Sequence, residues 1–595
     1  MSKVYLFIIL TISIVTASLY ISGNPIDFHC DSATFYNYGS QISTMFKKIF
    51  FITPFLLLFL FYFNKKFKIN KRVTILIIVS ILITSILILF SIFHKFTPYS
   101  ISNFSRPPVY PFFLFLTGVY LFDTFLVHII LQGIISLFCI CFIFSILKYL
   151  TNIHFAFICT ITYSLTSIPY ILITFIGAEQ LLFFFSIIYI FSLVHFYRTK
   201  KIKYLFIGGV ASTLAWLTRW EGQILFYNLI LFITIIAANE KKSIYFIKKS
   251  LPIFIIPIII LLSWTSGRSV LTKDFSGILK VTNVTNDQFF WKFYSVIPHQ
   301  IFFYEEKLNK KKQYSGKFNH WDIYPNEPPG TIIVRSENGK FSKEYFDQVY
   351  SFLNQNQGIY KEMKKPLDDS DAANNVNLYY ELFDKFDGNN IEIAKNIENQ
   401  PSVFYFNFIN EGLNKTIGQK EKDIIYKNTI FESLKENPLI IFISLAEFMQ
   451  VYGMDIKNGL IYDKIPYSNV ANGDFFTIFN GGTCATNNLT SKTYKEYESS
   501  HLNKKELNLY KFNDSINDFI RNYLGIFFIF SYIILMIKDF KLMFPLILLP
   551  ILLDLTTTIA NAPPTNSKYE ITSFTINFIL LSVFFYYLLK FKRKK

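Results

Sequence analysis

Residues 124–148 read TFLVHIILQGIISLFCICFIFSILK, and their only charged residue is Lys148 at the end. A helix that crosses a bilayer needs about 20 mostly apolar residues, so this run predicts a membrane span. Eleven further runs are long enough, or nearly so, and the twelve together predict a polytopic α-helical membrane protein. We expect the spans at 4–22, 47–64, 73–93, 124–148, 153–175, 180–197, 204–219, 223–238, 251–265, 522–538, 542–560 and 571–589.

The composition of the whole chain agrees with this class. Of 595 residues, 52% are apolar and only 17% are charged, whereas soluble domains have about 25% charged residues. Five cysteines are too few for a disulfide scaffold. The net charge of +17 suggests a nucleic-acid partner only until the positions of the charges are considered.

The basic residues gather in the turns on one side of the predicted membrane. With the N-terminus in the cytosol, the cytosolic segments hold 22 basic and 2 acidic residues, whereas 266–521 holds 30 basic and 32 acidic residues. Cytosolic loops of membrane proteins carry such an excess of Lys and Arg, so we expect no nucleic-acid partner. This topology requires 109–122 to lie in the interface. We expect a bacterial inner membrane with the active site facing outward, and favour an ER membrane less.

The spans divide the chain into three regions. We expect an N-terminal membrane region of about nine spans, an inserted extracytoplasmic domain of mixed α/β structure, and three last spans with a basic cytosolic tail. The apolar run after Pro438 is too short to cross, so it predicts an amphipathic helix on the membrane surface. The boundaries are 1–265 with its first loop at 23–46, 266–521 with the surface helix near 438–452, and 522–595.

Asp27 and Asp31 are the acids of the first outer loop. One interpretation makes Asp31 a helix N-cap, whose side-chain oxygen accepts a backbone N–H. The other makes it a general base at the membrane surface, close to a lipid-borne substrate. His29 and Cys30 lie beside these acids, but one His and one Cys are not a metal-ligand spacing, so we predict no metal.

Arg106 and Glu179 are the next candidates along the outer face. Arg106 opens the segment RPPVYP, where two prolines present it from a turn. One interpretation is that the guanidinium of Arg106 binds a phosphate through a bidentate fork. The other is that it anchors among the lipid headgroups. Glu179 stands at the outer end of a span, where a carboxylate usually has a partner or a task; the alternative is a solvated loop acid.

Two further segments place charges at the outer face. Leu217-Thr-Arg-Trp-Glu-Gly222 packs Arg219 and Glu221 into a short turn, either as a local salt bridge or as a substrate contact. Lys568 lies at the entrance of the last span, where it reaches a phosphate or extends toward the headgroups.

The order of these motifs resembles the GT-C superfamily of membrane glycosyltransferases, of the protein O-mannosyltransferase and aminoarabinose-transferase type. The order is Asp-Ser-Ala-x-x-Tyr from Asp31, Arg-Pro-Pro-x-Tyr-Pro from Arg106, a Glu after a span, Leu-Thr-Arg-x-Glu-Gly from Leu217, and a basic-Tyr pair, Lys568-Tyr569. This sequence departs from the family with Trp220 where Pro is common, and with two predicted spans between Asp31 and Arg106.

The resemblance implies transfer of a sugar from a polyprenyl-phosphate donor, on the outer face, to a glycan, lipid or protein. It implies Asp31, or Asp27, as the base. It implies that Arg106, Arg219 and Lys568 handle the donor phosphate or position the site, and that Glu179 lines the sugar pocket. Substrate contacts are implied for Tyr110, Glu221 and Tyr569. No cofactor is expected beyond the lipid-phosphate sugar itself.

Two other function classes compete with this hypothesis. A flippase or transporter of lipid-linked glycans should place ionisable groups at mid-membrane. Here only Asp554 lies deep inside a predicted span, whereas the candidate acids and bases gather at one face, which favours the transferase. A non-catalytic scaffold would use the outer domain to bind a partner, although only the size of that domain favours it.

Overall fold

The computed structural model describes residues 2–23, 107–166, 168–239, 252–272, 416–436, 525–560 and 567–592, with a few single residues between them. Within these ranges the chain is predominantly helical and contains no β-strand. Five segments are long and apolar enough to cross a membrane: Ser2–Ser22, Leu126–Leu150, Glu179–Thr199, Trp220–Ala238 and Ile571–Lys590. The coarse prediction of a helical membrane protein with several spans is therefore confirmed.

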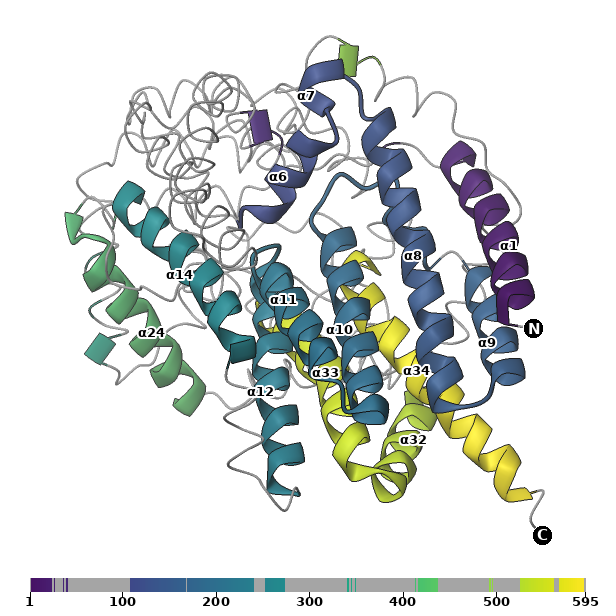
Figure 1. Cartoon of the computed structure of the whole chain (residues 1–595). Coiled ribbons are helices and arrows are strands. Elements are labelled where there is room, and N and C mark those ends of the chain that lie inside the picture. The colour runs from purple at the N-terminus through teal and green to yellow at the C-terminus, as the bar shows by residue number, and fades with distance from the viewer. Residues whose placement is uncertain are drawn as a thin grey trace, which may run out of the picture.

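These five segments correspond to five helices of the bundle (Figure 1). Their predicted positions agree with the structure to within a few residues, because long apolar runs leave little choice of element. The helices are α1 Ser2–Gly23, α8 Leu126–Leu150, α10 Glu179–Thr199, α12 Gln223–Ala238 with the 3₁₀ turn η1 Trp220–Gly222 before it, and α34 Ser567–Lys592.

The remaining bundle helices are α9 Ile153–Ser164, α11 Ile202–Trp216, α14 Pro252–Thr272, α32 Gly525–Lys538 and α33 Phe540–Ala560. The ends of α11, α32 and α33 lie within three residues of the predicted spans at 204–219, 522–538 and 542–560, whereas α9 and α14 differ more. The predicted span at 153–175 is wrong, because α9 ends at Ser164 and none of the described residues between it and α10 is helical. Also, α14 continues past the predicted domain boundary at 265.

The segment 109–122 forms two short helices, α6 Val109–Leu116 and α7 Val119–Phe122. Eight helical residues extend only about 12 Å, so neither helix crosses a bilayer, as the predicted topology requires. Gly118 separates them with φ 73°, in the left-handed region that glycine adopts without a Cβ clash. Leu121 and Phe122 are exposed beyond this turn.

Helix α10 is central to the bundle and packs against α8, α11, α33 and α34 (Figure 1). Small residues allow the closest approach: a Cβ on Gly208 of α11 would lie 3.4 Å from Ser192 Cβ on α10. In lipid, such close packing and interhelical hydrogen bonds replace the hydrophobic driving force.

A buried hydrogen-bond chain joins three helices of the bundle. The hydroxyl of Tyr189 on α10 donates to Asn228 Oδ1 on α12 at 2.7 Å, and Asn228 Nδ2 donates to the backbone oxygen of Pro545 on α33 at 2.9 Å. Polar groups within a membrane bundle need such partners. The chain therefore ties the C-terminal region to the N-terminal region.

Several predicted elements lie outside the described residues. They include the spans at 47–64 and 73–93, the surface helix near 438–452, and nearly all of the inserted domain at 266–521. Within that domain the structure describes α24, Gln419–Glu436, a helix that the sequence analysis did not predict. Its mixed charge gives no clear apolar stripe from which to predict it.

A substitution at Gly222 tests how closely the turn η1 packs against α11. A Cβ there would lie 2.2 Å from the backbone carbon and oxygen of Ala215 at the end of α11. Backbone atoms cannot yield as a flexible side chain does, so Gly222→Ala should lower the free energy of unfolding by about 1–3 kcal/mol. The measurement is thermal unfolding of detergent-purified protein, followed by size-exclusion chromatography.

Gly133→Ala is the matched control for this substitution. A Cβ at Gly133 meets only Ile21 Cδ1, at 3.9 Å, which is an ordinary contact. Alanine favours helix over glycine by about 1 kcal/mol, so this variant should be at least as stable as the wild type. Equal stability of the two variants would contradict the close approach of η1 to α11.

Candidate functional site

The turn between α11 and α12 presents Arg219. Helix α11 ends at Trp216, and Arg219 adopts an extended backbone conformation with φ −149° and ψ 149°. Its N–H donates to Ala215 O at 2.9 Å, and its carbonyl accepts from Gly222 N at 3.0 Å. The backbone is thus fixed on both sides of the arginine, which projects its guanidinium from the turn.

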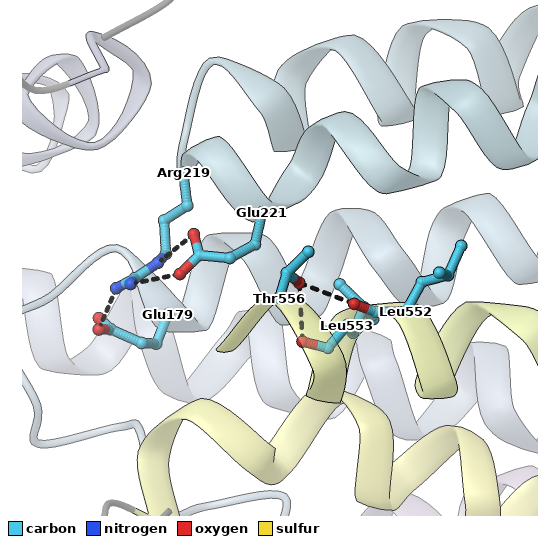
Figure 2. Close-up of polar contacts among 6 residues, drawn as sticks. All are labelled: Glu179, Arg219, Glu221, Leu552, Leu553 and Thr556. Carbon is cyan, nitrogen blue, oxygen red and sulfur yellow. Dashed lines mark hydrogen bonds and ion pairs between the residues drawn. The ribbon is translucent and has the colours of Figure 1, made fainter. Parts of the chain in front are cut away.

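Two carboxylates bind this guanidinium (Figure 2). Nε donates to Glu221 Oε2 at 3.0 Å and Nη2 donates to Glu221 Oε1 at 2.8 Å, which is a bidentate fork. Nη1 donates to Glu179 Oε1. The side chains of Arg219, Glu179 and Glu221 are only 10%, 5% and 3% exposed. We call these three residues the ion-pair cluster.

The ion-pair cluster bears on the alternatives that the sequence leaves open for Glu179, Arg219 and Glu221. The local salt bridge expected between Arg219 and Glu221 is present, and Glu179 joins it from another helix. The alternative that Glu179 is a solvated loop acid is wrong, because Glu179 is buried as the first residue of α10. A carboxylate is favoured at that position, since the N-terminus of a helix carries a partial positive charge.

Gly177 leaves the space that Glu179 occupies. A Cβ at Gly177 would lie 1.9 Å from Phe175 Cε1 and 2.4 Å from Glu179 Oε2. Glycine therefore allows an aromatic ring and a carboxylate to pack against the same backbone. Glu179 Oε2 has no hydrogen-bond partner among the residues that the structure describes.

The RPPVYP segment meets the Arg219 turn. The N–H of Val109, at the start of α6, donates to Leu217 O at 3.0 Å. Pro108 and Pro111 fit here because the first-turn N–H groups of a helix have no partner within the helix. Two motifs that lie far apart in the sequence are thus joined by a backbone hydrogen bond.

Tyr110 is held inside the bundle by His128. It is 0% exposed, and its hydroxyl lies 3.1 Å from His128 Nε2 on α8. Burial raises the pKa of the Tyr110 hydroxyl well above its ordinary value, and the negative charge of Glu179 raises that pKa further. Tyr110 therefore remains a neutral phenol, which suits an anchor for α6 rather than an acid or base.

The contacts of His128 favour a proton on Nδ1. Thr117 Oγ1 donates to Leu114 O at 2.9 Å and lies 3.3 Å from His128 Nδ1. His128 Nε2 lies 3.1 Å from the Tyr110 hydroxyl and 2.6 Å from Gln132 Nε2.

Gln132 extends this network to the segment before α10. Its Nε2 also donates to Phe175 O at 3.0 Å. The α6 anchor and the backbone that leads to Gly177 therefore share one buried network. The sequence analysis missed His128 and Gln132, although two polar residues four apart in an apolar run are a signal for a shared helix face.

Helix α33 lies beside the ion-pair cluster (Figure 2). Its Thr556 hydroxyl bonds its own helix, at 2.8 Å from Leu552 O and 2.9 Å from Leu553 O. Asp554 on the same helix is buried, with 2% of its surface exposed. The C-terminal region thus forms one side of the site.

Other predicted site residues are not brought together by the described part of the chain. Asp27, Asp31 and Arg106 lie outside the described residues, so their predicted roles stay predictions. Lys568 and Tyr569 lie in the first turn of α34, and only their backbone is described. Among the described residues no group of three or more His, Cys, Asp or Glu is arranged to hold a metal ion.

Comparisons of the chain with protein-family models, curated proteins and solved structures find no match.

A substitution of Tyr110 tests whether its hydroxyl anchors α6 to the bundle. Tyr110→Phe removes the hydroxyl that faces His128 and should lower the free energy of unfolding by about 0.5–1.5 kcal/mol, the usual net value of one hydrogen bond. Tyr227→Phe is the control, because Tyr227 is 54% exposed. Denaturant titration of both variants in mixed micelles provides the measurement. Equal losses of stability in the two variants would contradict the anchoring role of Tyr110.

Proposed function

We propose that this chain is a membrane glycosyltransferase of the GT-C type, which transfers a sugar from a polyprenyl-phosphate donor to an acceptor at the extracytoplasmic face. The proposal includes about twelve spans, an inserted mixed α/β domain over 266–521, and a bacterial inner membrane as the location. The proposed partners are membrane lipid, the lipid-linked sugar donor, and a glycan, lipid or protein acceptor.

The observation that carries this proposal is the meeting of motifs at one end of the bundle. The hydrogen bond from the Val109 N–H to Leu217 O joins the Arg-Pro-Pro-x-Tyr-Pro motif to the Leu-Thr-Arg-x-Glu-Gly motif. The ion pair between Arg219 and Glu179 joins the Leu-Thr-Arg-x-Glu-Gly motif to the Glu that follows a span. Separated motifs that converge on one buried charged cluster are typical of a functional site.

The charge pattern supports an outward-facing site. Helix α10 begins at Glu179 and ends at Thr199, next to the basic segment 198–203. Twenty-one helical residues extend about 30 Å, which is the thickness of the hydrocarbon core. The ion-pair cluster and the lysine-rich turn therefore lie at opposite ends of one span, and basic turns favour the cytosol.

The proposed chemistry divides between carboxylates and cations. Asp31 takes the proton of the acceptor hydroxyl, which is a poor nucleophile without a base. Arg106 and Lys568 stabilise the negative charge of the departing lipid phosphate. A single displacement at the anomeric carbon inverts its configuration.

The geometry favours a role for Arg219 other than binding the donor phosphate. Its guanidinium donates three hydrogen bonds to Glu179 and Glu221. Two carboxylates so close would repel an approaching phosphate. We therefore assign Arg219 to orienting Glu179, while Tyr110 holds α6 in place.

The second candidate function is a flippase or transporter of lipid-linked glycans. Buried Asp554 on α33 is the observation in its favour, since ionisable groups inside spans often mark transport pathways. The two functions differ in whether a glycosidic bond is formed.

Replacement of the proposed base tests transferase activity. Asp31→Asn should lower sugar transfer by about 10²- to 10⁴-fold, the usual contribution of a general base. The assay follows radiolabelled sugar from polyprenyl-phosphate donors to an acceptor in membranes that contain the full chain. Asp27→Asn is measured in parallel, because the sequence leaves either acid as the base.

Asp539→Asn is the matched control for this assay. Asp539 precedes α33 and accepts a hydrogen bond from the Tyr197 hydroxyl at 2.8 Å, near the end of α10 that lies away from Glu179. Asparagine keeps an acceptor oxygen there, so this variant should keep wild-type transfer. Full transfer by both Asp31→Asn and Asp27→Asn would exclude the first loop as the source of the base.

A further inference from the structure

Two turns of the bundle lie together at the end where α10 finishes (Figure 1). The hydroxyl of Tyr197, near the end of α10, donates at 2.8 Å to Oδ1 of Asp539, the residue between α32 and α33. Thr199 is the last residue of a segment that is long and apolar enough to cross a membrane. The α10–α11 turn and the α32–α33 turn therefore meet at one membrane–water boundary.

Basic side chains crowd these two turns. We call the basic residues of the two turns the basic seam: Arg198, Lys200, Lys201, Lys203, Lys538 and Lys541. All but Lys541 are exposed. Asp539 is the only acid of the segments 195–206 and 535–545. Like charges held close together repel each other, so an anion that lies across both turns lowers the energy of the basic seam.

The surface beside the basic seam is suited to a lipid. Ile537 and Phe540, which flank the α32–α33 turn, are 78% and 53% exposed. The ammonium nitrogen of Lys200 lies 5.0 Å from the centre of the Tyr197 ring. Lysines whose stems cover apolar surface, and tyrosines, are typical of the headgroup level of a bilayer. A lipid anion has acyl chains for the apolar residues, whereas a soluble anion has none.

We propose that the basic seam binds the phosphodiester of an anionic phospholipid, which contacts Arg198 from the first turn and Lys538 from the second. Its acyl chains lie against Ile537 and Phe540. Because the phosphodiester bridges the two turns, the lipid holds the C-terminal helices α32 and α33 against α10 and α11. This site lies at the opposite end of α10 from the ion-pair cluster, and it does not depend on the proposed function.

The experiment titrates the purified full chain, in neutral detergent micelles, with dioleoyl-phosphatidylglycerol or dioleoyl-phosphatidylcholine. Native mass spectrometry of the folded protein gives the apparent Kd for each lipid. The wild type should bind phosphatidylglycerol at least about tenfold more tightly than phosphatidylcholine, since each basic residue near the surface adds to the attraction. Phosphatidylglycerol should also raise the Tm by at least about 2 °C.

Substitutions of the two bridging cations test where the lipid binds. Arg198→Gln and Lys538→Gln should each weaken phosphatidylglycerol binding about fivefold, the usual effect of one basic residue near an anionic headgroup. The double variant should lose about 25-fold, together with the rise in Tm. Both side chains are exposed, so these variants should fold.

Lys492→Gln is the matched control, because it removes one positive charge from the other end of the bundle. Lys492 donates to Phe122 O at 2.9 Å, close to the start of α8. The end of α8 lies beside the end of α10, where the ring centroids of Tyr149 and His195 are 4.0 Å apart. This control should bind phosphatidylglycerol as the wild type does.

Three results would overturn the lipid site. They are equal Kd values for the two lipids, wild-type binding by the double variant, and complete displacement of phosphatidylglycerol by millimolar inorganic phosphate. Equal Kd values would leave the basic seam to an acidic protein partner, and displacement by phosphate would make it a site for soluble anions. Sugar transfer enters none of these measurements, so their failure leaves the proposed function standing.

Discussion

The ion pairs of the buried Arg219 guanidinium are the interactions on which the end of the bundle where α10 begins depends. This guanidinium joins Glu179, which begins α10, to Glu221, which precedes α12, while the backbone of its own turn bonds α11 and α6. Burying a charge costs several kcal/mol unless it is paired and hydrogen-bonded, and removing one partner leaves the others unpaired. The ion-pair cluster therefore links four segments into one structure, and it also fixes the only Glu179 oxygen that the described residues bind.

This structural role changes how the charged motifs are understood. An arginine near a membrane surface suggests phosphate binding when the sequence alone is considered. Here the guanidinium is already engaged by carboxylates, so its contribution is to orientation. The proposed division of labour follows: Arg106 and Lys568 meet the leaving phosphate, Asp31 meets the acceptor, and Glu179 meets the sugar. The basic turn after α10 lies about 30 Å away, at the other end of the same helix.

Parts of this arrangement could be predicted from the sequence and parts could not. The long apolar runs predicted α8 and α10 well, since an apolar helix in lipid must satisfy its own backbone. The pair Arg219–Glu221 could be predicted because the two residues are neighbours in the chain. The contact with Glu179 could not be predicted from sequence physics, because it depends on how α10 and α11 pack. The end of α9 at Ser164 was also missed, since the apolar run continues past it. Hydropathy gives no signal where a segment turns inside a bundle.

A double-mutant cycle between Glu179 and Arg219 tests the central claim most directly. The free energy of unfolding is measured in mixed micelles for the wild type, Glu179→Gln, Arg219→Met and the double variant. The account predicts a coupling energy of at least about 1.5 kcal/mol, as expected for a hydrogen bond between buried charged groups. A coupling energy below about 0.5 kcal/mol, the value of an exposed ion pair, would contradict the claim that this ion pair holds the site together.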